Sequence, residues 1–511
     1  MLYRLSSVVA AGTLMLLGSV GGATCVPRAR SFIYVVPDGY GPVSQTMARD
    51  YESITTGKST LGRPNSAQIG VDKMLIGTVR TQASDNIVTD SAASATAFAC
   101  GIKTYNGDLA VGVDDDGHPV ASVLEAAHLS GFKTGLVATS RITHATPAGY
   151  SSHVLNRDSE NEIAAQQIGH AHSFGAYVDL LLGGGRRHYL PSKAGGLRTD
   201  GVDLVAWAKG EGYNYAADRA AFDGAAVGGK LPLPFLGLFA GSHMAYELDR
   251  DDQKEPSLLD MTKVALASLE DASKGAQQGY FVMIEASRID HAGHSNDAPG
   301  HIHDILMYNN VMTYLQEYVA AHPDTQLLSA ADHECGGLTL PGQWDPQPLA
   351  AATRTSEHLV GLLAGYKGDD QRGYFRTELL PQYGLAGATD GVVDGLLATY
   401  KKSGSTALIV AMGNELSRKA GINWSTTGHT GVDVNLYGAA KAQGSMAALI
   451  GGNRDNTELP RYVEKALGVS MTNATAQLRA TEAAGRWKVQ RREDLAAIKR
   501  AANLAAWNHM P

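Results

Sequence analysis

The chain has 511 residues, which is enough for one large domain or for two to three smaller ones. Its 58 glycines and a hydrophobic fraction of 44% indicate a glycine-turned α/β protein with a sizeable core. A formal net charge of −8, without any long basic run, argues against a protein that binds nucleic acid.

The N-terminal residues have the pattern of an export signal. Arg4 is followed by no charged residue until Arg28, residues 8–17 are apolar, and residues 21–24 are small. This pattern predicts a signal peptide at residues 1–24 and a secreted or extracytoplasmic protein. The alternative is an uncleaved segment that anchors the protein in the vacuole or at the cell surface, since the uncharged stretch is almost long enough to span a membrane.

Short apolar runs recur along the chain with helical patterns between them. The alternation predicts an α/β fold with a large central, mostly parallel sheet that is flanked by helices on both faces. The expected strands are residues 32–36, 134–138, 177–182, 234–239, 281–284 and 326–329.

Two stretches depart from this alternation. Residues 345–425 look rich in loops and delay the candidate ligand His429, which predicts a cap-like, crown-like insertion over the site. Residues 476–511 are polar and rich in alanine, with seven Lys and Arg against three Asp and Glu, and predict a C-terminal helical tail.

Possible metal ligands follow the apolar run at residues 280–284. Within the next ten residues stand Glu285, Asp290, His291 and His294, and two similar clusters recur at residues 332–334 and 428–430. Open α/β sheets place their active sites at the carboxyl ends of their strands. The repeated pattern therefore predicts a metal enzyme.

Ser91 follows a β-type run and begins a stretch of small residues. A helix N-terminus of this kind favours an anion such as phosphate, although an ordinary helix cap formed by Asp90 and Ser91 has the same pattern. No G-x-S-x-G motif surrounds the serine, so a divalent cation is the expected activator of its hydroxyl group. Asp38, at the end of the first strand in a glycine turn, is a candidate ligand for that cation.

Together these segments resemble alkaline phosphatases in order and spacing from about residue 31 to 440. The resemblance implies a catalytic domain at residues 30–475 that contains the 345–425 insertion. It also implies hydrolysis of small phosphate monoesters, inorganic phosphate as a product inhibitor, and a homodimer. Residues 434–437 and 452–458 are most similar to fungal members. The matching segments are Asp38-Gly39, 89–97, 103–107, 144–147, Glu285…Asp290…His294, 332–334 and 428–431.

The resemblance also implies a role for each site residue. Ser91 would be the nucleophile that forms a phosphoserine, and Arg157, oriented by Asp90, would bind two phosphate oxygens. The planar guanidinium suits that task because it can bind phosphate through two parallel hydrogen bonds. Three ions would be held: one zinc by Asp290, His294 and His429; a second zinc by Asp38, Asp332 and His333, completed by Ser91; and a third ion, usually magnesium, by Asp38, Thr146 and Glu285.

His144 departs from many bacterial members, which carry an aspartate beside the third ion. A neutral nitrogen in place of a carboxylate removes negative charge and makes the site softer, so we expect the third ion either to bind more weakly or to be zinc or cobalt. His291 occupies a variable position near the bound phosphate. We expect both histidines to support the ligands rather than to bind the ions directly.

The sequence leaves two alternative functions and one possible disulfide undecided. A phosphodiesterase or sulfatase of the same superfamily is the nearest alternative, but the sequence around Ser91 lacks the C/S-x-P-x-R motif of sulfatases. A non-catalytic protein that binds phosphate or metal is the other alternative. Cys100 and Cys335 could form a disulfide, which a core of this size does not need.

Overall fold

The computed structural model describes residues 26–64, 67–106 and 118–483; the predicted signal peptide lies outside them. Its centre is a ten-stranded sheet in the order β14-β2-β13-β8-β1-β7-β3-β4-β6-β5. All neighbouring strands are parallel except those on either side of β13, which is antiparallel to both. The strands are β1 Ser31–Pro37, β2 Leu75–Arg80, β3 Lys133–Arg141, β4 Leu180–Gly184, β5 Asn214–Ala216, β6 Phe235–Leu238, β7 Tyr280–Ala286, β8 Thr325–Ala330, β13 Val434–Ala439 and β14 Gly452–Asp455.

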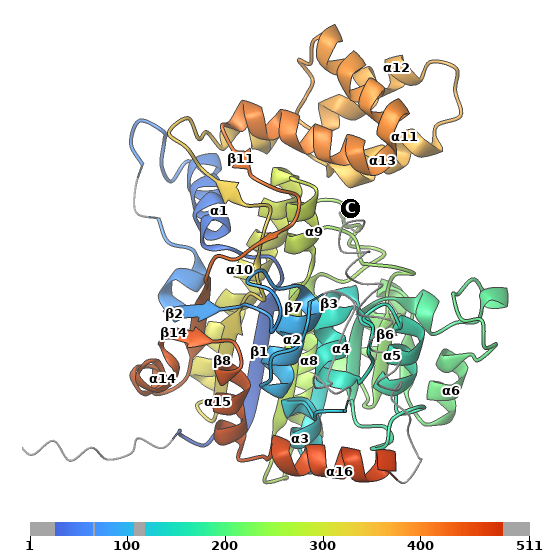
Figure 1. Cartoon of the computed structure of the whole chain (residues 1–511), viewed down its shortest axis with the longest axis vertical. Helices are drawn as coiled ribbons and strands as arrows, with labels where there is room; N and C mark the ends of the chain where they lie inside the picture. The colour runs from blue at the N-terminus through green and yellow to red at the C-terminus, as the bar shows by residue number, and fades with distance from the viewer. Residues whose placement is uncertain (1–25, 65–66, 107–117, 484–511) are drawn as a thin grey trace, which may run out of the picture.

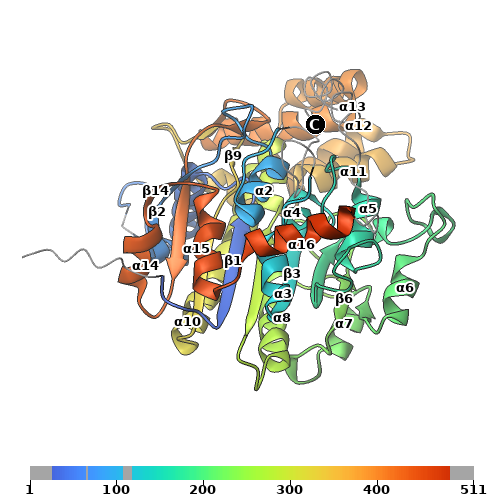
Figure 2. The same cartoon turned by 60° about the horizontal axis from the view of Figure 1, so that its bottom comes forward.

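Helices cover both faces of this sheet, as the sequence predicts (Figure 1). Helices α8 and α10 pack on one face, while α3, α4 and α15 pack on the other (Figure 2). The helices are α1 Pro42–Thr55, α2 Ser91–Cys100, α3 Val123–Leu129, α4 Ala145–Ser151, α5 Glu160–Gln167, α6 Leu204–Gly210, α7 Arg219–Ala225, α8 Leu258–Ala272, α9 Arg288–His294, α10 Ala298–Ala321, α11 Ser356–Gly365, α12 Gln371–Tyr374, α13 Asp390–Ala420, α14 Gln443–Ile450, α15 Glu458–Leu467 and α16 Met471–Ala483.

The central strands form because their side chains are apolar on both faces. Every residue of β1, β7 and β8 is buried, as expected of parallel strands that lie between two helical layers. β1 pairs with β7 on one side and with β8 on the other. The carboxyl ends of these three strands therefore lie side by side.

Two expectations about individual elements are wrong in their boundaries. The strand predicted at residues 177–182 is β4, which starts only at Leu180, because the Asp179 carboxylate, instead of a backbone carbonyl, accepts a 3.0 Å hydrogen bond from the Thr134 N–H of β3. The predicted tail helix already begins at Met471, and its residues beyond 483 lie outside the described part of the chain.

Residues 345–425, predicted to be rich in loops, contain α11, α12 and the 31-residue α13. Glycine breaks the helical period of α13, where Gly404 adopts φ 83°, so no continuous apolar stripe marks the helix in the sequence. This helical segment forms its own layer above the sheet, drawn in orange in Figure 1. Its apolar side chains, which include Leu359, Leu363 and Leu416, make a second core together with Met47 of α1 and Ile302 of α10.

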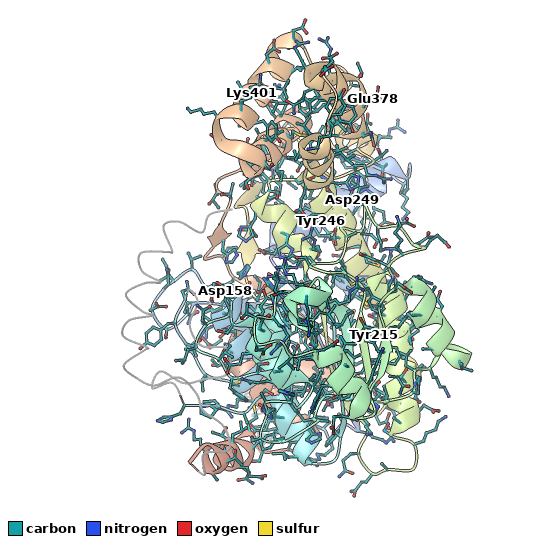
Figure 3. The ribbon with its side chains drawn as sticks, turned by 90° about the vertical axis from the view of Figure 1, so that its right-hand side faces the viewer. Asp158, Tyr215, Tyr246, Asp249, Glu378 and Lys401 are labelled. Carbon is teal, nitrogen blue, oxygen red and sulfur yellow. The ribbon has the colours of Figure 1, made fainter. Side chains whose placement is uncertain are left out.

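Hydrogen bonds attach the helical segment to the loop that follows β6. Asp249 accepts a 3.0 Å hydrogen bond from the Thr355 backbone N–H, and the Tyr246 hydroxyl donates a 3.0 Å bond to Glu357. Figure 3 shows Tyr246 and Asp249 below the helices that carry Glu378 and Lys401. Two small antiparallel pairs lie between this segment and the sheet: β10 Leu338–Thr339 with β11 Asn423–Trp424, and β9 Glu334–Cys335 with β12 His429–Thr430.

Within 26–64, 67–106 and 118–483, no helix combines the length and the apolar character that crossing a membrane requires.

The turn after β1 depends on Gly39. This residue has φ 72°, and a Cβ atom there would lie 2.6 Å from the Asp290 Cα. We expect Gly39→Ala to lower the free energy of unfolding by about 1–3 kcal/mol or more, since it combines backbone strain with a clash against backbone. Urea denaturation measures the change.

Gly57 supplies a matched control for this prediction. It has almost the same φ, 73°, but a Cβ atom would meet nothing within 4 Å. Gly57→Ala therefore carries only the left-handed backbone cost of about 1 kcal/mol. Equal losses in the two variants would show that the approach of α9 to Gly39 is not tight.

Candidate active site

Three carboxylates converge where β8, β1 and β7 end. Asp38 directly follows β1, Glu285 is the second-last residue of β7, and Asp332 lies two residues after the end of β8. All three side chains are completely buried. The backbone N–H of Gly39 donates a 3.2 Å hydrogen bond to Asp332 Oδ1, which joins the ends of two strands. The parallel sheet thus brings together residues that are almost 300 positions apart.

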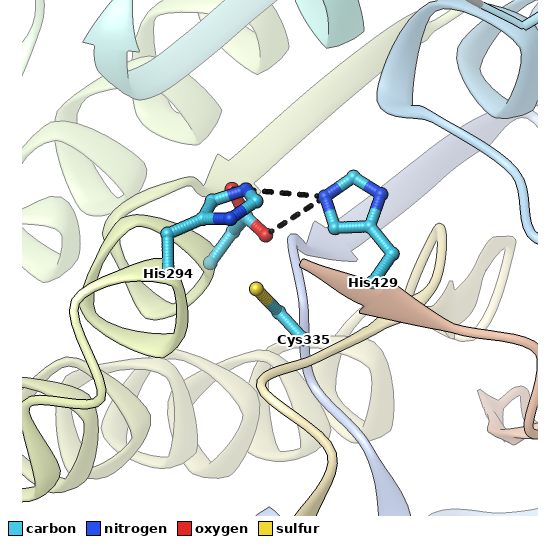
Figure 4. Close-up of side chains that lie close together, drawn as sticks. His294, Cys335 and His429 are labelled. Atoms are coloured by element: carbon cyan, nitrogen blue, oxygen red, sulfur yellow. Dashed lines mark hydrogen bonds and ion pairs between the residues drawn. The ribbon is translucent and has the colours of Figure 1, made fainter. Parts of the chain in front are cut away.

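The first cluster consists of Asp290 and His294 on α9 and His429 on β12 (Figure 4). The Nε2 atoms of the two histidines are 3.2 Å apart, and they lie 3.2 Å and 3.5 Å from the Asp290 carboxylate oxygens. Each Nδ1 lies within 3 Å of a backbone carbonyl, of Thr427 for His294 and of Thr89 for His429, and so carries the proton. Both Nε2 lone pairs therefore face the cluster, as in metal-ligating histidines.

The second cluster consists of Asp38, Ser91, Asp332 and His333. His333 Nε2 lies 3.1 Å from Asp332 Oδ2, 3.6 Å from Asp38 Oδ1 and 3.0 Å from Ser91 Oγ. Both oxygens of Asp38 and Oδ2 of Asp332 are buried without a hydrogen-bond partner. A buried carboxylate without a donor is costly, so the arrangement fits a cation better than it fits the protein alone.

The third cluster surrounds Glu285 and consists of Asp38, His144, Thr146 and Glu285. Glu285 Oε1, Thr146 Oγ1 and His144 Nδ1 are buried and lack hydrogen-bond partners, while Glu285 Oε2 accepts a 3.1 Å bond from Ser140. Carboxylate and hydroxyl oxygens are the donors that magnesium prefers. Since His144 Nε2 lies 3.1 Å from an Arg157 N–H group and accepts from it, Nδ1 carries a proton and faces this cluster as a donor.

Two of the three carboxyl groups show the cost of this burial in their pKa values; for Asp332, burial raises the pKa but His333 lowers it by more. Burial, followed by the charges of Asp332, Asp290 and Glu285, raises the pKa of Asp38 well above its usual value. Burial also raises the pKa of Glu285 to about 7. A divalent cation reverses this effect because its charge stabilises the ionised carboxylates.

Ser91 is the first residue of helix α2, all of which is buried. Asp90 caps the helix by accepting a 2.9 Å hydrogen bond from the Ala93 N–H, which confirms the helix cap predicted from the sequence. Ser94 Oγ donates a 3.0 Å bond to the Asp332 carbonyl and fixes the helix against the end of β8. The helix N-terminus, with its partial positive charge, therefore opens onto the second cluster.

Arg157 lies beside the nucleophile candidate, where the sequence predicts it. Its Nη1 donates a 3.2 Å hydrogen bond to Asp90 Oδ2, and its Nη2 donates to His144. Burial lowers the pKa of Arg157, but the negative charges of Asp90 and Asp158 raise it by more. The pKa is therefore above its usual value, and the guanidinium stays charged. All the predicted site residues thus lie in one connected group, with His291 at its margin.

Two further residues near the site were not predicted. His243, in the coil after β6, forms ring contacts with His144 and His291 at centroid distances of 5.3 Å and 4.4 Å. No local pattern marks this lone histidine in the sequence. Cys335 joins the first cluster, and its position two residues after His333 was an available signal. Cys100 and Cys335 are both free, buried thiols, so the disulfide considered above is absent.

Known proteins resemble this chain over most of its length. The family model described as alkaline phosphatase matches residues 29–469. The repressible alkaline phosphatase of Saccharomyces cerevisiae, a fungal relative, is 38% identical over 515 residues that span 93% of this chain and 89% of that protein.

Solved structures agree with this comparison. Thermus thermophilus alkaline phosphatase superposes with a TM-score of 0.74 at 25% identity and covers 96% of this chain and 100% of its own. A mutant of the alkaline phosphatase from the Antarctic bacterium TAB5, with Mg bound in its M3 site, has a TM-score of 0.59 at 26% identity. The match covers 87% of this chain and 99% of the TAB5 chain. The chain therefore belongs to the alkaline phosphatase family, whose members are phosphoric monoester hydrolases.

Proposed function

We propose that the chain hydrolyses phosphate monoesters through a phosphoserine on Ser91. The observation that carries this proposal is the convergence of Ser91 with buried carboxylates that have no hydrogen-bond donors. Such a site needs cations, and cations beside a serine at a helix N-terminus suit phosphoryl transfer. The fold of the catalytic domain, proposed at residues 30–475, supplies every one of these residues.

The residues of the chain divide the reaction between them. Ser91 Oγ forms the bond to phosphorus while the bond to the alcohol oxygen breaks, and the alcohol leaves with a proton. Water then attacks the phosphoserine, which releases inorganic phosphate and restores Ser91. Arg157 holds two phosphate oxygens in both steps, and Asp90 orients the guanidinium.

We assign two zinc ions to the first and second clusters, whose imidazole and carboxylate donors suit zinc. These ions would supply the positive charge that lowers the pKa of the attacking oxygens and neutralises the phosphate. Magnesium suits the oxygen donors of the third cluster. The protonated Nδ1 of His144 adds no negative charge there, so zinc or cobalt is an alternative ion for this cluster.

The remaining expectations belong to this proposal as well. We infer an extracytoplasmic protein with a signal peptide at residues 1–24, a homodimeric state and inhibition by inorganic phosphate. The helical segment 345–425 would act as a cap, because it lies above the carboxyl ends of the strands (Figure 1).

The nucleophile can be tested by Ser91→Ala. We expect the rate of p-nitrophenyl phosphate hydrolysis to fall by about 10⁴-fold or more, since the loss of an activated nucleophile costs several orders of magnitude. Radioactive phosphate should label the acid-quenched wild type and not the variant. Thr96→Ala, which changes a buried hydroxyl in the same helix, should retain activity. A variant that keeps more than about a tenth of the rate would exclude Ser91 as the nucleophile.

Metal removal tests the ion assignments. Chelation should abolish turnover at pH 8 to 10 and should also lower the melting temperature, because each ion stabilises the fold by about 4 kcal/mol at roughly 1,000 times its Kd. Zinc together with magnesium or cobalt should restore both properties, and the more effective second ion identifies the occupant of the third cluster. Turnover that resists chelation would contradict the mechanism.

Arg157 should decide between monoesters and diesters. A monoester dianion has one more charged oxygen for the guanidinium to bind than a diester has. We expect Arg157→Ala to lower kcat/KM for p-nitrophenyl phosphate by about 10²–10³-fold and to affect bis(p-nitrophenyl) phosphate less. Arg157→Lys keeps the positive charge but loses the planar, two-pronged guanidinium, so its kcat/KM for p-nitrophenyl phosphate should lie between those of the wild type and Arg157→Ala. Equal losses on both substrates, or a faster wild-type rate on the diester, would favour a phosphodiesterase.

A further inference from the structure

Cys335 lies directly opposite a predicted metal ligand. It is the second residue of β9, which pairs antiparallel with β12, and the register places it across from His429. Cross-strand neighbours have Cβ atoms about 5 Å apart, so their side chains lie close together. Figure 4 shows the Cys335 sulfur pointing into the space between His294 and His429.

The thiol sits within a compact group of donors. The sulfur of Cys335 and one donor atom each of Asp290, His294 and His429 all lie within 4.8 Å of one another. In a tetrahedral zinc site with bonds of about 2.0–2.3 Å, neighbouring donors are roughly 3.5 Å apart. A small contraction around one ion would bring all four donors into coordination, and expansion to five ligands would keep a position for a phosphate or water oxygen.

The neighbouring helix leaves room for this side chain. At Gly293 of α9, an added Cβ atom would lie 2.9 Å from the Cβ of Cys335 and 3.0 Å from its sulfur. Any other residue at this position would push the thiol away from the cluster. The absence of a side chain at Gly293 therefore lets the sulfur approach the ligands on α9.

A second observation also favours a cation in the space between Asp290, His294 and His429. Asp290 is 3% exposed, and its Oδ1 has no hydrogen-bond partner. The Nε2 lone pairs of both histidines face the same space. A neutral thiol cannot compensate these groups, whereas an ion bound by all four residues would satisfy them together.

We propose that Cys335 is a fourth protein donor to the ion held by Asp290, His294 and His429. This inference rests on the metal site of the proposed function and adds a sulfur ligand to it. Thiolate prefers soft cations, so the first cluster should retain cadmium more strongly than a site made only of nitrogen and oxygen donors. The contrasting arrangement is a thiol that only donates a hydrogen bond to Asp290.

Optical titration separates these two arrangements. The metal-free full-length protein is titrated with Cd²⁺, and the ultraviolet charge-transfer band from sulfur to cadmium is recorded for the wild type and Cys335→Ser. Serine preserves a hydrogen bond to Asp290 but provides no sulfur. We expect the band in the wild type, its loss in Cys335→Ser, and a rise of more than about tenfold in the Cd²⁺ concentration at half-saturation.

The other two cysteines are the matched controls, because Cys25→Ser and Cys100→Ser should keep both the band and the affinity. Absence of the band from the wild type, which does not depend on the folding of any variant, would overturn the proposal. Persistence of the band in Cys335→Ser would overturn it too. Zinc-dependent hydrolysis of p-nitrophenyl phosphate by the wild type is measured in parallel, so that failure of the sulfur ligand is distinguishable from failure of the phosphatase function.

Discussion

The mutual repulsion of buried carboxylates at the ends of β8, β1 and β7 is the constraint on which the rest of the structure depends. Asp38, Glu285 and Asp332 are completely buried, and several of their oxygens lack a donor. Like charges at this density destabilise the fold unless protons or cations neutralise them. Burial, with a smaller contribution from the charge of Asp332, raises the pKa of Glu285 to about 7. Since β1 pairs with both neighbours, the sheet that forms the core also enforces this concentration of charge.

Residues at or just beyond the carboxyl end of a buried strand were predictable, because the end of an apolar run marks both the strand and its edge. Glu285 and Asp332 belong to this group. His429 lies in a two-residue strand, so its cluster with residues 428 and 430 marked it as a candidate ligand, but only the family resemblance paired it with Asp290 and His294. His243 was missed because tertiary packing alone brings its coil to the site. The sheet was likewise predictable, whereas the glycine-interrupted α13 was not, since Gly404 disrupts the helical period.

The hydrogen bond on the far side of the ring separates the two histidines of the first cluster from those of a structural network. In the buried group of Glu125, His153 and His172, the Nδ1 of His172 accepts a 3.2 Å bond from the Phe174 N–H, so its Nε2 carries a proton. That Nε2 faces Glu125 Oε1 at 3.0 Å, and His153 Nε2 lies 2.8 Å from the same oxygen. Burial raises the pKa of Glu125, but His153 and His172 together lower it by more than burial raises it. The two histidines therefore stabilise the ionised carboxylate without a cation. The first cluster has the opposite polarity, with its Nδ1 protons donated outward to carbonyls.

The helical segment 345–425 acts on the site through both ends of α9, although its helices supply none of the assigned ligands. At the start of α9, Arg288 stacks on the Tyr246 ring at 3.6 Å and donates a 3.3 Å hydrogen bond to Glu357 on α11. Beyond its other end, Asp297 accepts bonds of 2.6 Å and 2.8 Å from the backbone N–H and hydroxyl of Ser356. Two ligands of the first cluster lie between these anchors. Because α9 is only seven residues long, a shift of α11 would move the ligands with it. The segment is therefore placed to influence the geometry of the proposed metal site through residues that are not among the proposed ligands.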